Sequence, residues 1–477
     1  MKPIYKCLFV FAILFNSLSS AGPATYPKTL TYDLDMTIDY ETEKLSANCE
    51  ITYSNKSDEP IETIPLLLYR LLSVSSITDK DNNELPFTQK IISVTGWEKL
   101  QVNFIEIPLQ NKLQPKEQMT IKMAYSGYLL GYTETGWRYV KDHISKNFTI
   151  IRTDGFGYPI IGYPDDDEMM AIVKESYDYQ ASITVPEDVL VANGGQLVNK
   201  ISKDNQTTWI YKSKKPAWRM DFAVAGYQLL EENENKIFYF PQDSSGARNI
   251  MDALKNSFNL YTSWFGPLDN YKGYSIIEVP EGYGSQQDIT CSMLTADNFK
   301  SENKLTGLYH EISHLWNVKP LEKQPCRVES EGYAQFTQFL ALEKLENREN
   351  AVAKAAQRYI DRLRKTFNEK EDLQSIPVKD YGVRDMTDYS YTLGMVMFAV
   401  MYNKVGETDY YKMIGSFYKK YLASGASLDD FTRHFNNETS ADLQPFFDDW
   451  IYTTKAIAHI TAGKSYNDLL ELYSNSN

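Results

Sequence analysis

Apolar and polar side chains alternate along the first half of the chain. Over residues 30–39 the two kinds take turns almost residue by residue, as in a strand with one buried face. Turn residues at 81–84 and 193–195 separate further runs of this type. Many short strands in series predict an antiparallel β-sandwich or saddle, and we expect one N-terminal β domain over residues 22–230. The predicted strands cover residues 30–39, 48–53, 102–107, 119–125, 179–185 and 208–211.

After residue 231 the apolar positions recur every three or four residues. Ile250, Leu254, Phe258 and Tyr261 follow this spacing and predict a helix over residues 248–265. Strands first and helices afterwards indicate an α+β chain, with a mostly helical second domain over residues 231–457 and a loosely attached polar tail over residues 458–477. The pattern also predicts a strand at 274–279 and helices at 305–316, 331–344, 351–365, 394–405 and 410–422.

The first 21 residues have the layout of a secretory signal peptide. Lys2 and Lys6 precede an apolar run, and Ser19 and Ala21 suit the positions before a cleavage site. The run is shorter than the roughly 20 apolar residues that cross a bilayer. We therefore expect a secreted or periplasmic protein with no stable membrane span, with a retained signal anchor as the alternative.

Composition narrows the class of protein. A chain of 477 residues is too long for one ordinary core. Its 43% hydrophobic and 23% charged residues are typical of a globular protein. A formal net charge of −14 repels phosphate backbones, and no cluster of Lys and Arg offsets it. We therefore expect no nucleic-acid partner.

The strongest chemical signal is the run His310-Glu311-Ile-Ser-His314. Histidines four residues apart project from the same face of a helix, so both imidazoles can bind one metal ion. Glu311 then lies beside the metal, where it can take a proton from water. The chain has only five His, and two of them are in this motif. A pair of ordinary core histidines is the alternative interpretation.

Two histidines leave a zinc ion short of one protein ligand and a water. Glu331 is the best candidate, because it opens a predicted helix that can run back along the first and present its carboxylate. Glu329 is the nearby alternative. Three other residues qualify only if the fold brings them close: His143, His434 and His459.

These motifs resemble the gluzincin metallopeptidases, especially the aminopeptidase N family. The resemblance begins with His310-Glu-Ile-Ser-His314 followed by Ser330-Glu331-Gly-Tyr-Ala, and it covers most of the chain. A stretch at 315–319, Leu-Trp-Asn-Val-Lys, is also similar to the glycyl aminopeptidase family. Further similar motifs are Leu30-Thr-Tyr-Asp-Leu-Asp, Val191-Ala-Asn-Gly194, Tyr391-Thr-Leu-Gly394, Val405-Gly-Glu-Thr-Asp-Tyr410 and Asp442-Leu-Gln-Pro-Phe-Phe-Asp-Asp-Trp450.

The resemblance implies a thermolysin-like catalytic domain behind a β domain. It implies that His310, His314 and Glu331 hold one zinc ion and that Glu311 is the general base. It also implies that Tyr391, which precedes the apolar run 393–401, donates a hydrogen bond to the oxyanion.

The substrate-binding motif departs from the family pattern. Where the family has Gly-Ala-Met-Glu-Asn, this chain has Gly284-Ser285-Gln286-Gln287-Asp288. The family glutamate grips the free amino group of the substrate, and a neutral amide at Gln287 holds an ammonium group less strongly than a carboxylate does. Asp288 is one position away from the place where it would compensate. The gap from His314 to Glu331 is also about two residues shorter than the family pattern, which a loop can absorb.

The sequence therefore predicts a zinc peptidase, of aminopeptidase type, acting on peptides or proteins. A zinc endopeptidase or a hydrolase of non-peptide substrates is the main alternative, supported by the changed motif. The larger family members carry a further helical domain, so without it we expect a more open cleft. A binding protein without activity is the remaining alternative.

Overall fold

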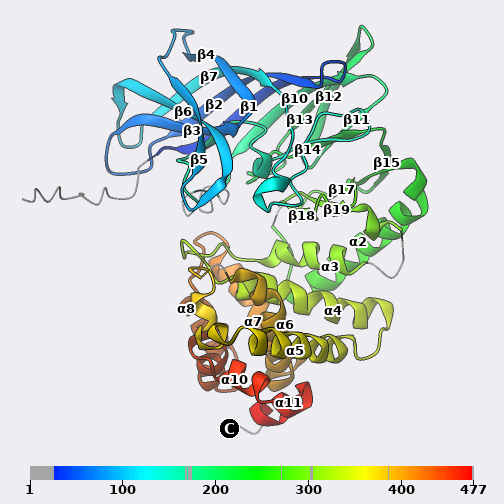
Figure 1. The fold of residues 1–477 in the computed structure, drawn as a ribbon. Coiled ribbons are helices and arrows are strands. Elements are labelled where there is room, and N and C mark those ends of the chain that lie inside the picture. The colour runs from blue at the N-terminus through cyan, green and yellow to red at the C-terminus, as the bar shows by residue number, and fades with distance from the viewer. Residues whose placement is uncertain are drawn as a thin grey trace, which may run out of the picture.

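The computed structural model describes residues 26–166, 169, 175–269, 271–300, 305–384 and 386–474. The predicted signal peptide lies outside the described residues. A β domain lies at one end of the molecule and a helical region at the other, with a smaller sheet between them (Figure 1). The prediction of an α+β fold, with an N-terminal β domain followed by a mostly helical domain, is confirmed.

Two sheets form the main core of the β domain. The larger has the strand order β12-β13-β10-β1-β2-β7-β4 and the smaller the order β5-β6-β3-β9. Their inward side chains share one core, which includes Leu34, Ile51, Ile105 and Ile183. The alternation in the sequence thus corresponds to a real buried face. The strands are β1 (Lys28–Asp39), β2 (Lys44–Ser54), β3 (Ile61–Tyr69), β4 (Leu72–Asp79), β5 (Thr88–Val94), β6 (Trp97–Leu113), β7 (Gln118–Gly127), β9 (Ile160–Ile161), β10 (Asp178–Pro186), β12 (Gln196–Lys203) and β13 (Gln206–Lys212).

Two smaller sheets connect the β domain to the helices. One has the order β11-β14-β8, and the other β15-β16-β17-β19-β18. Strands β16, β17 and β19 run parallel, whereas β18 is an antiparallel edge strand beside β19. The predicted domain boundary after residue 230 falls inside β15. The strands are β8 (Thr149–Ile151), β11 (Leu190–Asn193), β14 (Phe222–Ala225), β15 (Gln228–Glu232), β16 (Asn235–Tyr239), β17 (Ser275–Val279), β18 (Gln286–Gln287) and β19 (Cys291–Thr295).

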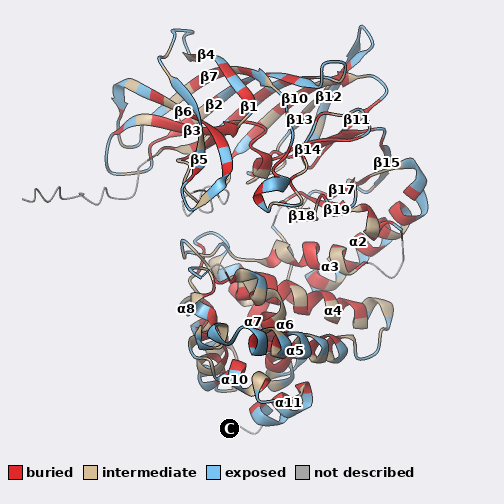
Figure 2. Ribbon diagram, in the orientation of Figure 1, coloured by how far each residue is buried: buried red, intermediate tan, exposed pale blue. Residues whose placement is uncertain are grey.

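The helices bury their inner faces in a second large core and expose their outer faces (Figure 2). This core includes the middle of α6, where Val396, Phe398 and Met401 are fully buried or nearly so. The helices are α2 (Ser244–Phe265), α3 (Thr306–Ser313), α4 (Tyr333–Glu346), α5 (Ala351–Glu369), α6 (Thr387–Val405), α7 (Glu407–Tyr421), α8 (Leu428–Glu438), α9 (Gln444–Phe447), α10 (Lys455–Thr461) and α11 (Tyr466–Ser474).

Three predicted segments differ from the structure. The helix expected at 305–316 is α3 followed by a 3-10 turn, His314–Trp316. The helix expected from residue 331 begins as a π-helical turn, Val328–Gly332, before α4. The segment expected as a loosely attached polar tail folds as the end of α10 and as α11, because Leu469 and Tyr473, one helical turn apart, bury an apolar face against the helical core.

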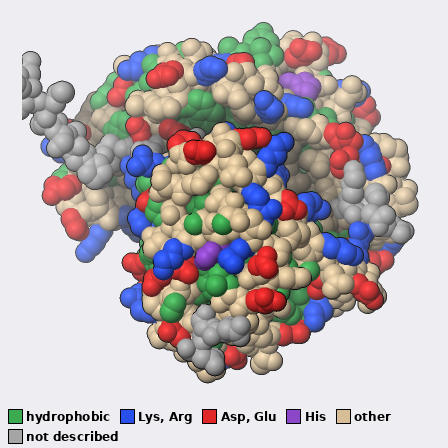
Figure 3. Space-filling model, turned by 60° about the horizontal axis from the view of Figure 1, so that its bottom comes forward, with side chains coloured by type: hydrophobic (Ala, Val, Ile, Leu, Met, Phe, Trp, Pro, Cys, Tyr) green, Lys and Arg blue, Asp and Glu red, His purple; other side chains and the backbone are tan. Residues whose placement is uncertain are grey.

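The surface carries mixed charge. Figure 3 shows acidic and basic side chains interspersed over one face of the molecule. None of the helices in the described part of the chain has the length and apolar character that a bilayer crossing requires. Cys49, Cys291 and Cys326 are buried free thiols that form no disulfide.

Candidate active site

His310 and His314 lie side by side at the end of α3. His310 is in the last turn of the helix, and His314 begins the 3-10 turn that follows. Their side chains are 11% and 12% exposed, and their Nε2 atoms are 3.2 Å apart. The fold therefore keeps the helical i, i+4 arrangement that the motif predicts, although the α-helix ends between the two residues.

Glu331 approaches both histidines from the π-helical turn. Its Oε2 lies 3.3 Å from Nε2 of His310 and 3.5 Å from Nε2 of His314. Ligands about 2.0–2.1 Å from a tetrahedral zinc ion are about 3.3–3.4 Å from one another. The three atoms have this spacing, so the donor set fits zinc in number, chemistry and geometry.

Arg327 binds the other oxygen of Glu331. A nitrogen of its guanidinium donates to Oε1, which leaves Oε2 facing the histidines. Burial opposes ionisation of this carboxyl, but the charges of His314 and Arg327 hold the pKa of Glu331 well below its ordinary value. Glu331 is therefore a carboxylate at neutral pH, as a metal ligand must be.

Asn317 fixes the ring of His314 from the opposite side. Its side-chain amide lies 2.7 Å from Nδ1 of His314. The Oδ1 atom of Asn317 is buried and has no hydrogen-bond partner. Turning the amide over exchanges its oxygen and nitrogen, which places Oδ1 against Nδ1 of His314. With Nδ1 of His314 protonated and donating to this amide, Nε2 is left free to bind a metal.

Glu311 points from the same helix and is 9% exposed. Burial raises its pKa to about 7; the nearby Glu331 carboxylate adds to the shift and His310 opposes it. A carboxyl group that exchanges a proton near neutral pH has the property of a general base.

Two glycines bring Tyr391 to the histidines. Gly332 and Gly394 pack backbone against backbone, and a Cβ on either would lie 2.6 Å from the Cα of the other. This contact places the turn carrying Glu331 directly against α6. The ring of Tyr391 is parallel to that of His310, with a centroid separation of 6.3 Å. Because α6 begins at Thr387, Tyr391 lies within that helix, not before it as its sequence position suggested.

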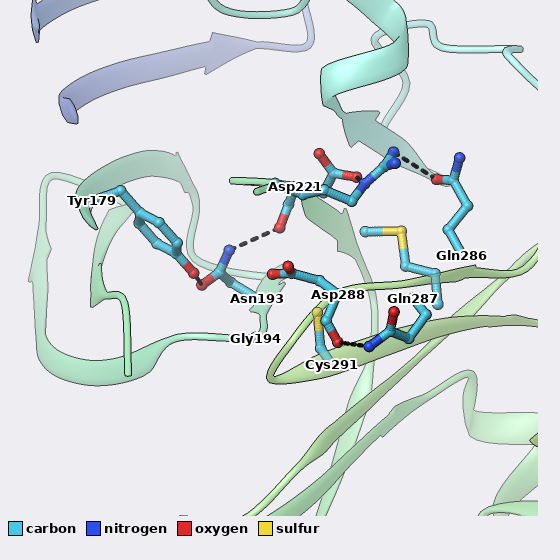
Figure 4. A pocket seen from close by; sticks show the side chains of 10 residues that line it. Tyr179, Asn193, Gly194, Asp221, Gln286, Gln287, Asp288 and Cys291 are labelled. Atoms are coloured by element: carbon cyan, nitrogen blue, oxygen red, sulfur yellow. Dashed lines mark hydrogen bonds and ion pairs between the residues drawn. The ribbon is translucent and has the colours of Figure 1, made fainter. Parts of the chain in front are cut away.

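The altered substrate motif divides its side chains between two environments. The Gln286 amide contacts charged residues of the β domain, whereas Gln287 donates to the backbone oxygen of Asp288 at 2.6 Å. Asp288 is 5% exposed beside a cavity of about 10 Å³ that Gln287 and Cys291 also line (Figure 4). Burial raises the pKa of Asp288 to about 7. Such burial argues against Asp288 as a substitute for the missing glutamate.

The remaining motif residues and the alternative ligands also have definite places. Gly284 has a positive φ of 72° and packs against Tyr139, and Ser285 Oγ accepts from the backbone of Thr295 at 3.4 Å. Among the described residues, the one group suited to hold a metal is His310, His314 and Glu331. The alternative ligands are engaged elsewhere or lie on other elements: Glu329 accepts from the Cys326 thiol, His143 contacts Tyr283, His434 contacts Ser416, and His459 is in α10.

Sequence reasoning missed several residues of this site. Arg327 lies four residues before Glu331, a spacing at which helical side chains meet, and that signal was available. Asn317 belongs to the Leu-Trp-Asn-Val-Lys motif at 315–319, but nothing in that motif indicates that its side chain contacts His314. The contact between Gly332 and Gly394 joins residues 62 positions apart, and no local pattern predicts it.

Comparison of the sequence with protein-family models and with curated proteins gives no match. The fold, however, is similar to crystal structures of an M1 zinc metallopeptidase from Deinococcus radiodurans. A mutant of that enzyme bound to the substrate Tyr-Ser-Ala has a TM-score of 0.65 and 17% identity, covering 89% of this chain and 94% of that chain. A further structure of the enzyme has a TM-score of 0.62 and 17% identity, covering 89% of this chain and 93% of that chain.

Proposed function

We propose that this chain is a zinc-dependent peptidase whose metal is held by His310, His314 and Glu331. The observation that carries the proposal is the convergence of two imidazole nitrogens and one carboxylate oxygen at tetrahedral spacing. Two His and one Glu form a donor set of catalytic zinc sites, which keep a fourth position open. The likeness of the fold to an M1 zinc metallopeptidase supports the same function.

Each nearby side chain has a role in this proposal. Zinc, when bound, supplies positive charge that polarises a peptide carbonyl and makes water a stronger acid. Glu311 takes the proton from the attacking water and passes it to the leaving amine. Burial holds the pKa of Tyr391 above its ordinary value, so its hydroxyl keeps its proton and donates to the carbonyl oxygen as negative charge develops there.

We propose cleavage of aminopeptidase type as the first candidate for specificity. The similar fold that binds the tripeptide Tyr-Ser-Ala supports a peptide substrate. One observation favours an endopeptidase as the second candidate: Gln287 is neutral, and the neighbouring carboxylate of Asp288 is buried. Gln287 therefore binds the free amino group of a peptide less strongly than a glutamate at that position would.

The test is mass spectrometry of defined peptides incubated with the mature protein, beside Glu311→Gln. We expect the wild type to cleave and the variant to lose turnover while its zinc content is unchanged. Loss of single residues from free amino ends identifies an aminopeptidase, and internal cuts identify an endopeptidase. A fully active, zinc-loaded Glu311→Gln would contradict the mechanism. No cleavage by zinc-loaded wild type would direct attention to non-peptide substrates or to binding alone.

We also propose export of the mature chain, on the basis of the N-terminal pattern. The intact mass of the protein purified from its native host tests this, because removal of the first 21 residues is expected. An uncleaved N-terminus would favour the signal anchor.

A further inference from the structure

Strand β18 is too short to hold its own position. It consists of Gln286 and Gln287, which pair with Met293 and Ser292 of β19, and one further backbone hydrogen bond joins the N–H of Asp288 to the oxygen of Cys291 at 2.7 Å. So few backbone contacts cannot offset the entropy of ordering the loops on either side. The strand also lies against α3, the helix of the histidines. Whatever fixes β18 therefore fixes one edge of the candidate active site.

The side chain of Gln286 is bound at both ends by the β domain. Its Oε1 accepts from Arg152 at 3.3 Å and from Arg219 at 3.2 Å, and its Nε2 donates to Asp154. Figure 4 marks one of these contacts with a dashed line, the one between Gln286 and Arg219, which lies beside Asp221. An amide is the side chain that can accept from two guanidinium groups and donate to a carboxylate at once. Glutamate would place a second carboxylate against Asp154, and methionine would satisfy none of the three partners.

The partners of Gln286 are themselves rigidly held. Arg152 is fully buried, forms an ion pair with Asp142 at 2.7 Å and donates to the backbone oxygen of Tyr139 at 2.9 Å. Arg219 pairs with Asp154 at 2.9 Å and with Asp221 at 2.7 Å. A buried network in which each charge has a partner of opposite sign is a stiff support.

Arg152 also binds the segment that leads into β18. It donates to the backbone oxygen of Tyr283 at 3.1 Å, a contact that spans 131 residues of sequence. The chain is therefore held by the same arginine at Tyr283 and again at Gln286. Gln287 has no such role, because its amide contacts only the backbone of the next residue in the hydrogen bonds that the structure describes.

We propose that Gln286 is a positioning residue, which holds the edge strand β18 in place beside α3 for an extended peptide to bind. The inference rests on the proposed peptidase function. A peptide that adds to a sheet edge depends on the exact position of that edge for its backbone hydrogen bonds. The β domain, which holds none of the predicted catalytic residues, thus supports substrate binding by holding Gln286 in place.

The test compares Gln286→Met with wild type in the full mature chain. Methionine keeps the length of the side chain and removes both polar ends. We expect KM for a hexapeptide to rise about tenfold or more, with kcat changed by less than about threefold, because the substrate support moves and the reacting groups do not. Zinc affinity, measured by competition with a chelator, is expected to stay unchanged. Hydrogen exchange of the segment 283–291 is expected to become faster.

Tyr139→Phe is the matched control. It removes the hydroxyl that donates to Asp154 at 3.3 Å and leaves every contact of Gln286 in place, so its KM is expected to stay within about twofold of wild type. Gln286→Asn, which keeps an amide of shorter reach, repeats the test if the methionine variant does not fold.

An unchanged KM in Gln286→Met overturns the proposal. So does a parallel fall in kcat and zinc affinity, which would indicate a general structural role. The exchange measurement separates this failure from failure of the proposed function. If the wild type cleaves no peptide, the peptidase assignment is wrong, and unchanged exchange at 283–291 then also refutes the anchoring of β18.

Discussion

Gly394→Ala tests whether the glycine contact sets the distance between Tyr391 and the proposed metal ligands. The new Cβ would lie 2.6 Å from the Cα of Gly332 and 2.9 Å from a methyl group of Val328. Non-bonded carbon atoms prefer about 3.5–4.0 Å, so α6 and the π-helical turn must separate by about 1 Å. Because backbone atoms form one side of the contact, no side-chain rotation relieves it.

Two effects of different size follow from this separation. Overpacking costs about 1–3 kcal/mol of stability, but alanine gains about 1 kcal/mol over glycine inside a helix, so the net loss of stability is about 0–2 kcal/mol. Activity is far more sensitive, because a displacement of about 1 Å between reacting groups costs on the order of 100-fold. We therefore expect kcat/KM to fall about 100-fold while the protein stays folded.

The assay is kcat/KM for a peptide that the wild type cleaves, with zinc content and melting temperature measured on the same samples. Gly226→Ala is the control, since a Cβ at Gly226 meets nothing within 4 Å. It is expected to match wild type in all three measurements. If Gly394→Ala binds zinc fully and keeps kcat/KM within about twofold of wild type, the contact does not control the geometry of the site.

Three further predictions concern the metal and the ionisable groups. Asn317→Ala is expected to weaken zinc binding about 10–100-fold in a chelator competition, because the ring of His314 loses its partner; equal affinity would contradict that role. Zinc added to metal-free protein at about a hundredfold excess over Kd is expected to stabilise it by about 2.7 kcal/mol, measured as a rise in melting temperature. The melting temperature of His310→Ala is expected not to rise when zinc is added. Burial raises the pKa of Glu278 from its ordinary 4.5 to about 8. Between these two pH values the folded chain keeps a proton on Glu278 that the unfolded chain releases. The free energy of unfolding is therefore expected to fall as pH rises through this range. In Glu278→Gln the amide oxygen can still accept from the backbone of Phe240, but the group no longer titrates. The difference between the urea midpoints at about pH 5 and pH 8 is expected to be smaller in this variant than in wild type. An equal difference in both proteins would assign the pH dependence to other groups.

The sequence alone determined the class of fold and the central chemistry. The alternation in the strands and the helical spacing after residue 231 are local properties of the chain. A strand or helix that buries one face must carry apolar residues at that period, so the pattern indicates the element. The pair His310 and His314 is local in the same sense, because the helix itself sets their relative position. Glu331 could be chosen because it is the acidic residue that opens the next helix.

Only the tertiary structure decided which distant residues complete the site. Tyr391 reaches His310 because Gly332 and Gly394 allow two backbones to touch, and Gln286 is held by Arg152 across 134 residues of sequence. The polar-looking C-terminal segment likewise packs because α6 offers its apolar residues a surface. Such contacts depend on how separate elements pack in space, and the periodicity within one element carries no information about its partner.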